Sequence, residues 1–172
     1  MDAAPVTDRG AQMSVSTLIQ PSDRRAVQAA AGPAMAEWLL ALGSVVYRLD
    51  YGGRVAAVGG DGAAVDLLGA AHPLATLDAV DAGTDSLAAG SYDLVCVLDG
   101  LAELADPVGT ARRALRLARP TGALVVVEAS RPDGFVDGPI TIGGWLTRAG
   151  AARVRLLAAT SHGFVLDART TH

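Results

Sequence analysis

Short apolar runs alternate with helix-like stretches from residue 54 to the end of the chain. Residues 92–98 (YDLVCVL) and 123–128 (ALVVVE) are continuous apolar runs rich in β-branched side chains, which is typical of strands buried on both faces of a parallel sheet. The stretch between them starts with Asp106 as a candidate N-cap and Pro107 at the first helical position. We therefore predict a right-handed βαβ unit whose two strands end at the same edge of the sheet.

The remaining runs extend this unit into a mainly parallel sheet. Two more parallel strands are expected at residues 54–58 and 74–80. The runs at residues 154–159 and 163–168 predict a terminal antiparallel pair, and residues 131–139 form a Gly/Pro-rich loop before the last helix. The alternation of strands and helices indicates an α/β fold.

Two further segments precede the first predicted strand. Residues 1–22 are small, polar and without period, so we expect a disordered arm or an arm onto a partner. Residues 23–49 are broken near Gly32 and Pro33, which predicts two short helices that cover an edge of the sheet, with contact to a substrate as their alternative role. With 172 residues, 51% of them hydrophobic, the chain is long enough for one compact domain, expected over residues 23–172.

Several motifs follow one another in the second half of the chain. They are Asp-Ala at 81–82, Gly-Ser-Tyr-Asp-Leu-Val from 90, Leu-x-x-Leu-x-Asp-Pro from 101, Arg-Pro-x-Gly from 119 and Leu-Val-Val-Val-Glu from 124. In this order they resemble the second half of a class I S-adenosylmethionine-dependent methyltransferase, and the similarity spans roughly residues 54–169. The resemblance implies a Rossmann-like sandwich, S-adenosylmethionine as cofactor, and methyl transfer to a small molecule or biosynthetic intermediate.

The glycine-rich loop of that family follows the first strand, where missing side chains let the backbone approach the cofactor. Here the stretch is VAAVGGDGAAV, in which Gly59 takes the place of the first family glycine and Asp61 that of the second. A shift by one position uses Gly60 and Gly62 instead, and Ala57 stands where the family usually has an acid. The motif is degraded, and the resemblance still implies that residues 59–62 contact the methionine end of the cofactor. The alternative is that the glycines only turn the chain between a strand and a helix.

Asp81 fits two positions of the family pattern. The family has a second strand that ends in an acid for the ribose hydroxyls, and a third strand followed by an Asp-Ala pair near the adenine. We assign Asp81 and Ala82 to the adenine side, which implies that one strand and one helix have been lost, and we place Asp99 beside the sulfonium. The alternatives are the ribose role for Asp81, or Asp78 and Asp81 as simple strand caps in solvent.

Candidate catalytic residues are few. The family often carries histidines in the two positions before the second leucine of Leu-x-x-Leu, and these are Ala102 and Glu103 here. Glu103 is a candidate proton acceptor, although an acid near a helix start also fits a dipole partner in solvent. Glu128 ends a predicted strand and is a second candidate, with binding of backbone N–H groups of the following loop as its alternative role.

The sequence contains no residue pattern that is typical of a metal site or of a reactive thiol. The three histidines have no metal-ligand spacing, and the single Cys96 lies inside an apolar run where it is expected to pack as a small hydrophobe. We therefore predict no metal site.

Charge and composition limit the classes of partner that this chain is expected to bind. The net charge is −4 and the chain has no basic patch beyond one face of a helix, so nucleic acid is not an expected partner. No apolar run is long enough for a membrane span, and a cytoplasmic location is expected.

Two functions from different classes follow. The first is a small-molecule methyltransferase. The second is a non-catalytic descendant of the same fold that serves as a partner subunit or a binding module, since a fold does not fix a function. Because a shortened sheet leaves a face or an edge without cover, we also expect self-association or a protein partner.

Overall fold

The computed structural model describes most of the chain from the first strand onward. The arm predicted at residues 1–22 and the helices predicted at 23–49 lie outside the described residues, apart from Leu49. The described residues are 49, 52–60, 62–81, 87–98, 100–129, 137–160 and 163–170, without the side chains of Glu103, Ala129 and Thr160.

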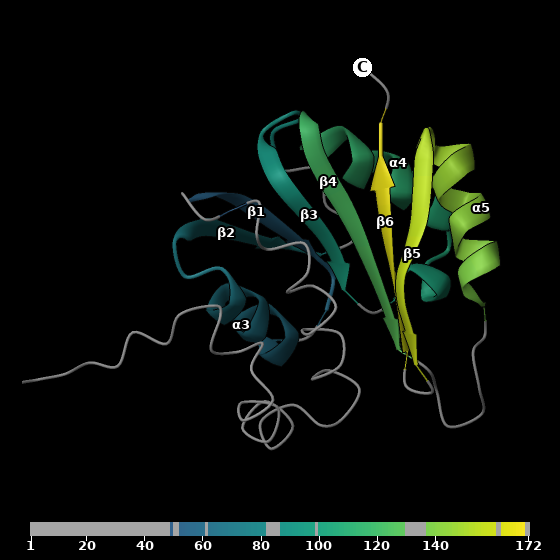
Figure 1. The fold of residues 1–172 in the computed structure, drawn as a ribbon, viewed down its shortest axis with the longest axis horizontal. Helices are drawn as coiled ribbons and strands as arrows, with labels where there is room; N and C mark the ends of the chain where they lie inside the picture. The colour runs from purple at the N-terminus through teal and green to yellow at the C-terminus, as the bar shows by residue number, and fades with distance from the viewer. Residues whose placement is uncertain are drawn as a thin grey trace, which may run out of the picture.

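A six-stranded mixed sheet forms the centre of the described structure (Figure 1). The strand order is β2-β1-β3-β4-β6-β5, in which β1 to β4 are parallel and β6 is antiparallel to both of its neighbours. This confirms the predicted α/β class and the terminal antiparallel pair. The strands are β1 (Gly53–Val58), β2 (Ala75–Val80), β3 (Tyr92–Leu98), β4 (Ala118–Ala129), β5 (Arg153–Thr160) and β6 (Gly163–Arg169).

Three α-helices and one 3₁₀ turn connect the described strands. They are α3 (Gly62–Ala71), η1 (Leu101–Glu103), α4 (Pro107–Leu117) and α5 (Pro139–Ala149). Helix α4 starts as the sequence predicts, with Pro107 in its first turn and the Asp106 carboxylate accepting the Gly109 N–H at 2.8 Å. Helix α5 ends at Gly150, whose left-handed φ of 113° releases the chain toward β5.

The strand side chains alternate between two cores, one on each face of the sheet. Val95 and Val97 of β3 face α4 and α5, whereas Leu94 and Cys96 face the side of α3. Figure 1 shows the same layers, with α4 and α5 on one side of the sheet and α3 on the other. Burial on both faces explains why β3 and β4 read as continuous apolar runs rather than alternating ones.

Strand β4 begins five residues before the predicted start at residue 123. The chain leaving α4 already pairs with β3, because Ala118 lies opposite Tyr92 before the register shifts and Ala123 lies opposite Leu94. The shift brings the backbone close, and a Cβ on Gly122 would lie 2.8 Å from the carbonyl oxygen of Tyr92. The irregular Arg-Pro-x-Gly segment pairs because of tertiary contacts with β3, and the local pattern of hydrophobic residues does not predict such pairing.

The helices are short. Helices α4 and α5 have 11 residues each, and no helix within the described ranges is long and apolar enough to cross a membrane.

Candidate functional site

The loops that follow the parallel strands meet at one edge of the sheet, the carboxyl edge. Residues 59–62 follow β1, Asp81 follows β2, and the segment from Gly100 follows β3. Open α/β sheets bind ligands at this edge, since strand ends and helix starts leave polar backbone groups there. The candidate site is therefore built from these three loops.

The turn after β1 depends on two glycines in left-handed conformations, Gly59 with φ 71° and Gly60 with φ 83°. The Gly59 N–H donates to the Val80 carbonyl at 2.9 Å, which ties this turn to the end of β2. A Cβ on Gly60 would lie only 2.7 Å from the Cβ of Leu98 at the end of β3. Packing inside the protein therefore requires glycine at position 60.

Gly62 begins α3 in a different environment. A Cβ placed on Gly62 would meet no atom of the described residues within 4 Å. The first turn of α3 contains no acidic residue, and the first N–H groups of a helix have no helical acceptors. Among the described residues, this end of α3 thus leaves room beside backbone donors, which suits a carboxylate. Asp61 lies outside the described residues.

Asp81 lies directly beyond the last pair of the β1–β2 ladder. Val80 pairs with Val58, so the next residue of each strand, Asp81 and Gly59, emerge side by side at the carboxyl edge. Asp81 is exposed to solvent. Of the predicted cofactor residues, the structure brings Gly59, Gly60, Gly62 and Asp81 together, whereas Ala82 and Asp99 lie outside the described residues.

The loop after β3 turns at Gly100, whose φ is 139°, and continues into η1. Glu103 ends η1, and its side chain lies outside the described residues. Glu128, the other predicted catalytic candidate, is only 6% exposed, and its Oε1 accepts the Leu101 N–H at 2.8 Å. This matches the alternative role predicted for a strand-end acid, except that the N–H belongs to the loop after the neighbouring strand.

Cys96 and His72 are buried away from solvent. Burial raises the pKa of the Cys96 thiol to about 12, which is the opposite of what a thiolate nucleophile needs. Burial lowers the pKa of His72 to about 4, and both ring nitrogens lack a hydrogen-bond partner among the described residues. Within the same ranges, no three potential metal ligands lie together.

A polar cluster that the sequence analysis did not find ties β1, β2 and β3 together. Arg54 Nη2 lies 2.8 Å from Asp78 Oδ2, the Tyr92 hydroxyl donates to the same oxygen at 2.8 Å, and the Arg54 guanidinium stacks over the Tyr92 ring. The bonds from Tyr92 and Arg54 lower the pKa of Asp78. Only the pairing of Arg54 with its neighbours on β2 could have predicted this cluster, and that pairing requires the strand register to be known.

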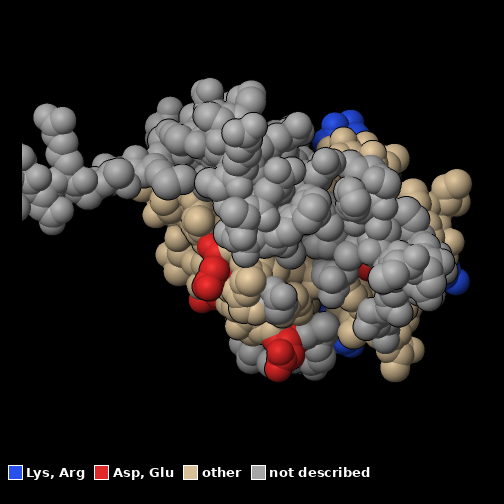
Figure 2. Space-filling model, turned by 90° about the horizontal axis from the view of Figure 1, so that it is seen from below, with Lys and Arg blue, Asp and Glu red and all other residues tan. Residues whose placement is uncertain are grey.

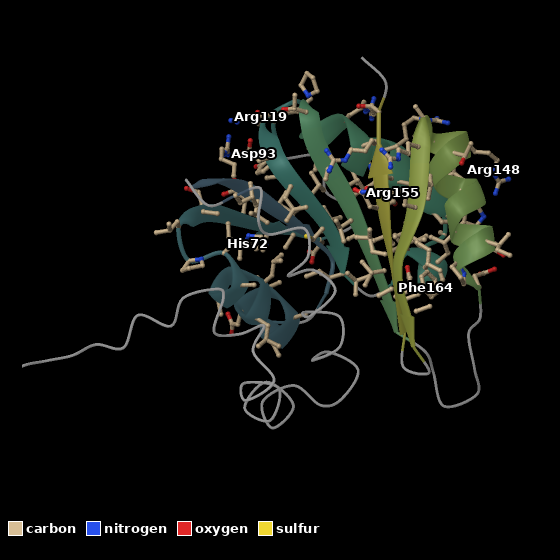
Figure 3. The ribbon with its side chains drawn as sticks, in the orientation of Figure 1. His72, Asp93, Arg119, Arg148, Arg155 and Phe164 are labelled. Carbon is tan, nitrogen blue, oxygen red and sulfur yellow. The ribbon has the colours of Figure 1, made fainter. Side chains whose placement is uncertain are left out.

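The opposite end of the sheet from the candidate site carries another ion pair. Asp93 at the start of β3 accepts the Arg54 backbone N–H at 2.8 Å and pairs with Arg119 at 2.7 Å. Figure 3 shows Asp93 and Arg119 beside each other at the amino ends of the strands. These contacts hold the strands together and stay remote from the carboxyl edge.

Figure 2 views the molecule from the end toward which β3 and β4 point in Figure 1. Among the residues drawn in colour, acidic side chains lie on this face and basic ones lie mainly at its margin. The described part of the face carries no basic cluster of the kind that binds phosphate backbones.

Comparisons with known proteins identify the fold. No protein-family model matches the sequence, and no curated protein matches it. Among solved structures, the carbon methyltransferase CurJ is 15% identical with a TM-score of 0.63, over 92% of this chain and 60% of that one. This chain thus spans less than two thirds of the CurJ chain's length.

Two further structures agree with the first. An S-adenosylmethionine-dependent methyltransferase from Aquifex aeolicus is 18% identical with a TM-score of 0.60, over 90% of this chain and 95% of that one. PigF, solved with S-adenosylhomocysteine, is 13% identical with a TM-score of 0.60, over 87% and 65% of the two chains. The described structure therefore has the class I methyltransferase fold, as the resemblance implies.

Proposed function

We propose that this chain binds S-adenosylmethionine at the carboxyl edge of its sheet and transfers the methyl group to a small molecule. The observation that carries the proposal is the open position of Gly62 at the start of α3, directly after a turn formed by two left-handed glycines. A Cβ there has no neighbour among the described residues, so their packing gives no reason for glycine at this position. Close approach of a ligand supplies that reason.

The residues at the edge fit the cofactor's parts. The first N–H groups of α3 suit the carboxylate of the methionine end, because they are donors at the positive end of the helix dipole. Bound S-adenosylmethionine supplies an electrophilic methyl group on its sulfonium. The structure of PigF with S-adenosylhomocysteine supports a ligand of this class on the same fold.

Two roles were considered for Asp81, contact with the ribose and contact with the adenine. The sequence analysis assigns Asp81, together with Ala82, to the adenine side. Direct pairing of β2 with β1 supports the ribose role instead, since it sets Asp81 beside Gly59. The test is to compare S-adenosylhomocysteine with its 2′-deoxyribose analogue. In the ribose role, Asp81→Ala weakens the parent ligand by about tenfold and leaves the analogue little changed, because the lost hydrogen bond to the hydroxyl is charge-assisted.

Methyl transfer from a sulfonium depends mainly on alignment of the acceptor atom with the methyl carbon. Glu128 is engaged by the Leu101 N–H, so we do not assign it the role of a general base. Glu103 stays a predicted proton acceptor, and Asp99 stays a predicted neighbour of the sulfonium. The carbon methyltransferase CurJ on the same fold supports methyl transfer as the class of reaction.

The test is calorimetric titration of the full chain, purified free of bound ligand, with S-adenosylmethionine and S-adenosylhomocysteine. We expect micromolar dissociation constants, about −8 kcal/mol. Release of S-adenosylhomocysteine in the presence of candidate acceptors then tests transfer itself. No binding at millimolar ligand contradicts the proposal and favours a non-catalytic partner subunit or binding module.

A further inference from the structure

Strand β3 leaves the sheet one pair before Glu128. The last β3–β4 pair is Leu98 with Val127, after which the β3 chain turns through Gly100. Glu128 is the next residue of β4, and its carboxylate accepts the Leu101 N–H at 2.8 Å. A side chain thus holds the chain of β3 to β4 beyond the point where backbone pairing ends.

This hydrogen bond lies in the protein interior. Leu101 is fully buried and Glu128 is 6% exposed. The Phe164 residue that pairs with Glu128 from β6 is also buried, and Figure 3 places it near the end of the sheet toward which β4 points. A buried N–H without an acceptor is costly, so removal of this acceptor forces the Gly100–Leu101 peptide to move or to take in water.

The same peptide continues the end of β3, which packs against the glycine turn of the proposed cofactor site. Leu98 precedes it in the chain and sits in direct contact with the position of Gly60, where a Cβ would lie 2.7 Å from Leu98 Cβ. The glycine turn after β1 therefore packs on the end of β3, and the continuation of β3 is fixed by Glu128. A shift of the Gly100–Leu101 peptide alters the wall against which the glycine turn rests.

We infer that Glu128 is a positioning residue, which fixes the Gly100–Leu101 peptide at the border of the ligand site and controls ligand affinity through it. The inference rests on the proposed function for its ligand, but the fixed peptide is independent of any ligand. Glu128 acts here as a hydrogen-bond acceptor, so a side chain that keeps an acceptor at the same reach replaces it.

The experiment uses the full chain with four substitutions. Glu128→Gln keeps an acceptor oxygen at the same reach, Glu128→Asp shortens the reach by one methylene, and Glu128→Leu removes the acceptor. Val126→Ala is the matched control, because Val126 is fully buried on the same strand and face but forms no side-chain hydrogen bond. Each protein is titrated with S-adenosylhomocysteine, and hydrogen exchange at the Leu101 amide is followed without ligand.

Expected results separate positioning from plain destabilisation. Glu128→Gln stays within about threefold of the parent affinity, whereas Glu128→Leu loses about tenfold or more, in line with loss of one buried hydrogen bond. The affinity of Glu128→Asp lies between those of the other two variants. If the leucine variant does not fold, the comparison of Glu128→Asp with Glu128→Gln takes its place. Val126→Ala lowers stability and leaves affinity unchanged. Exchange at the Leu101 amide is fast only in the leucine and aspartate variants.

Three outcomes overturn the inference. Parent-like affinity in a folded Glu128→Leu protein removes the link to the ligand, and an equal loss in Glu128→Gln shows that the carboxylate charge, rather than the hydrogen bond accepted from Leu101, sets the affinity. If the parent protein does not bind S-adenosylhomocysteine, the proposed function fails, and exchange at Leu101 still decides the positioning role. Slow exchange in Glu128→Leu then overturns it.

Discussion

At the scale of single residues, the two glycines that flank Asp61 respond to different surroundings. A side chain on Gly60 collides with Leu98, whereas one on Gly62 meets no atom of the described residues within 4 Å. We predict that Gly62→Val folds normally, because a side chain at this helical position, where φ is ordinary, displaces none of the described residues. The same variant should weaken S-adenosylhomocysteine binding at least about tenfold by filling the space beside the first turn of α3, as calorimetry can measure.

A matched control is available in another helix. A Cβ added to Gly144 in α5 would also meet no described atom within 4 Å, so Gly144→Val carries the same change away from the glycine turn. It should bind like the parent protein. Unchanged affinity in Gly62→Val would place the ligand elsewhere. By contrast, Gly60→Val cannot report on ligand contact, since its effect on packing comes first.

His72 makes stability depend on pH. Its pKa is lowered from 6.5 to about 4 by burial, so the folded state keeps it neutral while the unfolded state takes up a proton below pH 6.5. Stability therefore falls as pH drops from about 6.5 toward 4, by about 3 kcal/mol in total. His72→Leu should remove this loss, and it should not destabilise the protein at pH 7, because both buried ring nitrogens have no partner among the described residues.

Urea unfolding of the two proteins at pH 7 and at pH 5 checks this prediction. The comparison between variant and parent cancels the contribution of groups common to both. An equal pH dependence in both proteins would show that His72 is protonated without cost in the folded state.

At the scale of elements, α4 offers a direct test of a feature read from the sequence. The Asp106 carboxylate caps the helix through the Gly109 N–H, and Pro107 fixes the first turn. Asp106→Ala should lower the free energy of unfolding by about 1 kcal/mol. Asp106→Asn, which keeps an acceptor oxygen, should lose much less. Chemical denaturation measures both, and equal losses would assign the effect to charge rather than to the cap.

The strands and α4 were predictable because their signals are local. The apolar runs of β3 and β4 are long enough to indicate buried strands, and the Asp106-Pro107 pair marks the start of α4 by cap chemistry alone. The extension of β4 back to Ala118 was not predictable, since it depends on pairing with Tyr92 across the sheet. The Arg54–Asp78 bridge was missed for the same reason, because strand register decides which residues face each other.

The site was predictable in part. Gly59, Gly60, Gly62 and Asp81 gather at one edge because parallel strands end together, a rule that needs only the order of elements. The partner of Glu128 was not predictable, because its carboxylate reaches a loop 27 residues away in the chain. A sequence pattern identifies the acid but not the N–H that it accepts.

At the scale of the whole molecule, the two outer strands of the sheet differ. Strand β5 carries Arg153 and Arg155 and an irregularity between Leu156 and Ala158, which are features that discourage strand addition. Strand β2 carries one charged residue, Asp78, which is paired with Arg54 of β1, and its register with β1 is regular. Among the described residues, the exposed large apolar side chains are Leu74 just before β2, Ile140 on α5 and Leu156 on β5.

We therefore predict that any self-association uses the outer edge of β2. Light scattering at micromolar concentration should report a species larger than the 17.4 kDa chain. Ala79→Lys, a charge on the exposed face of this edge strand, should shift the protein toward the monomer, whereas Ala159→Lys in β5 should not. A parent protein that stays monomeric, without binding a hydrophobic dye, would mean that the chain completes its own cover.

The contact between Gly60 and Leu98 has a consequence for how such chains change over generations. Because packing against Leu98 excludes any side chain at position 60, that glycine persists whether or not a ligand is ever bound. Position 62 is under no such constraint from the described residues, so drift would replace its glycine once a ligand ceased to matter. On the proposed function, the residue at position 62 in descendants of this chain therefore records whether the ligand site is still in use, and the residue at position 60 does not.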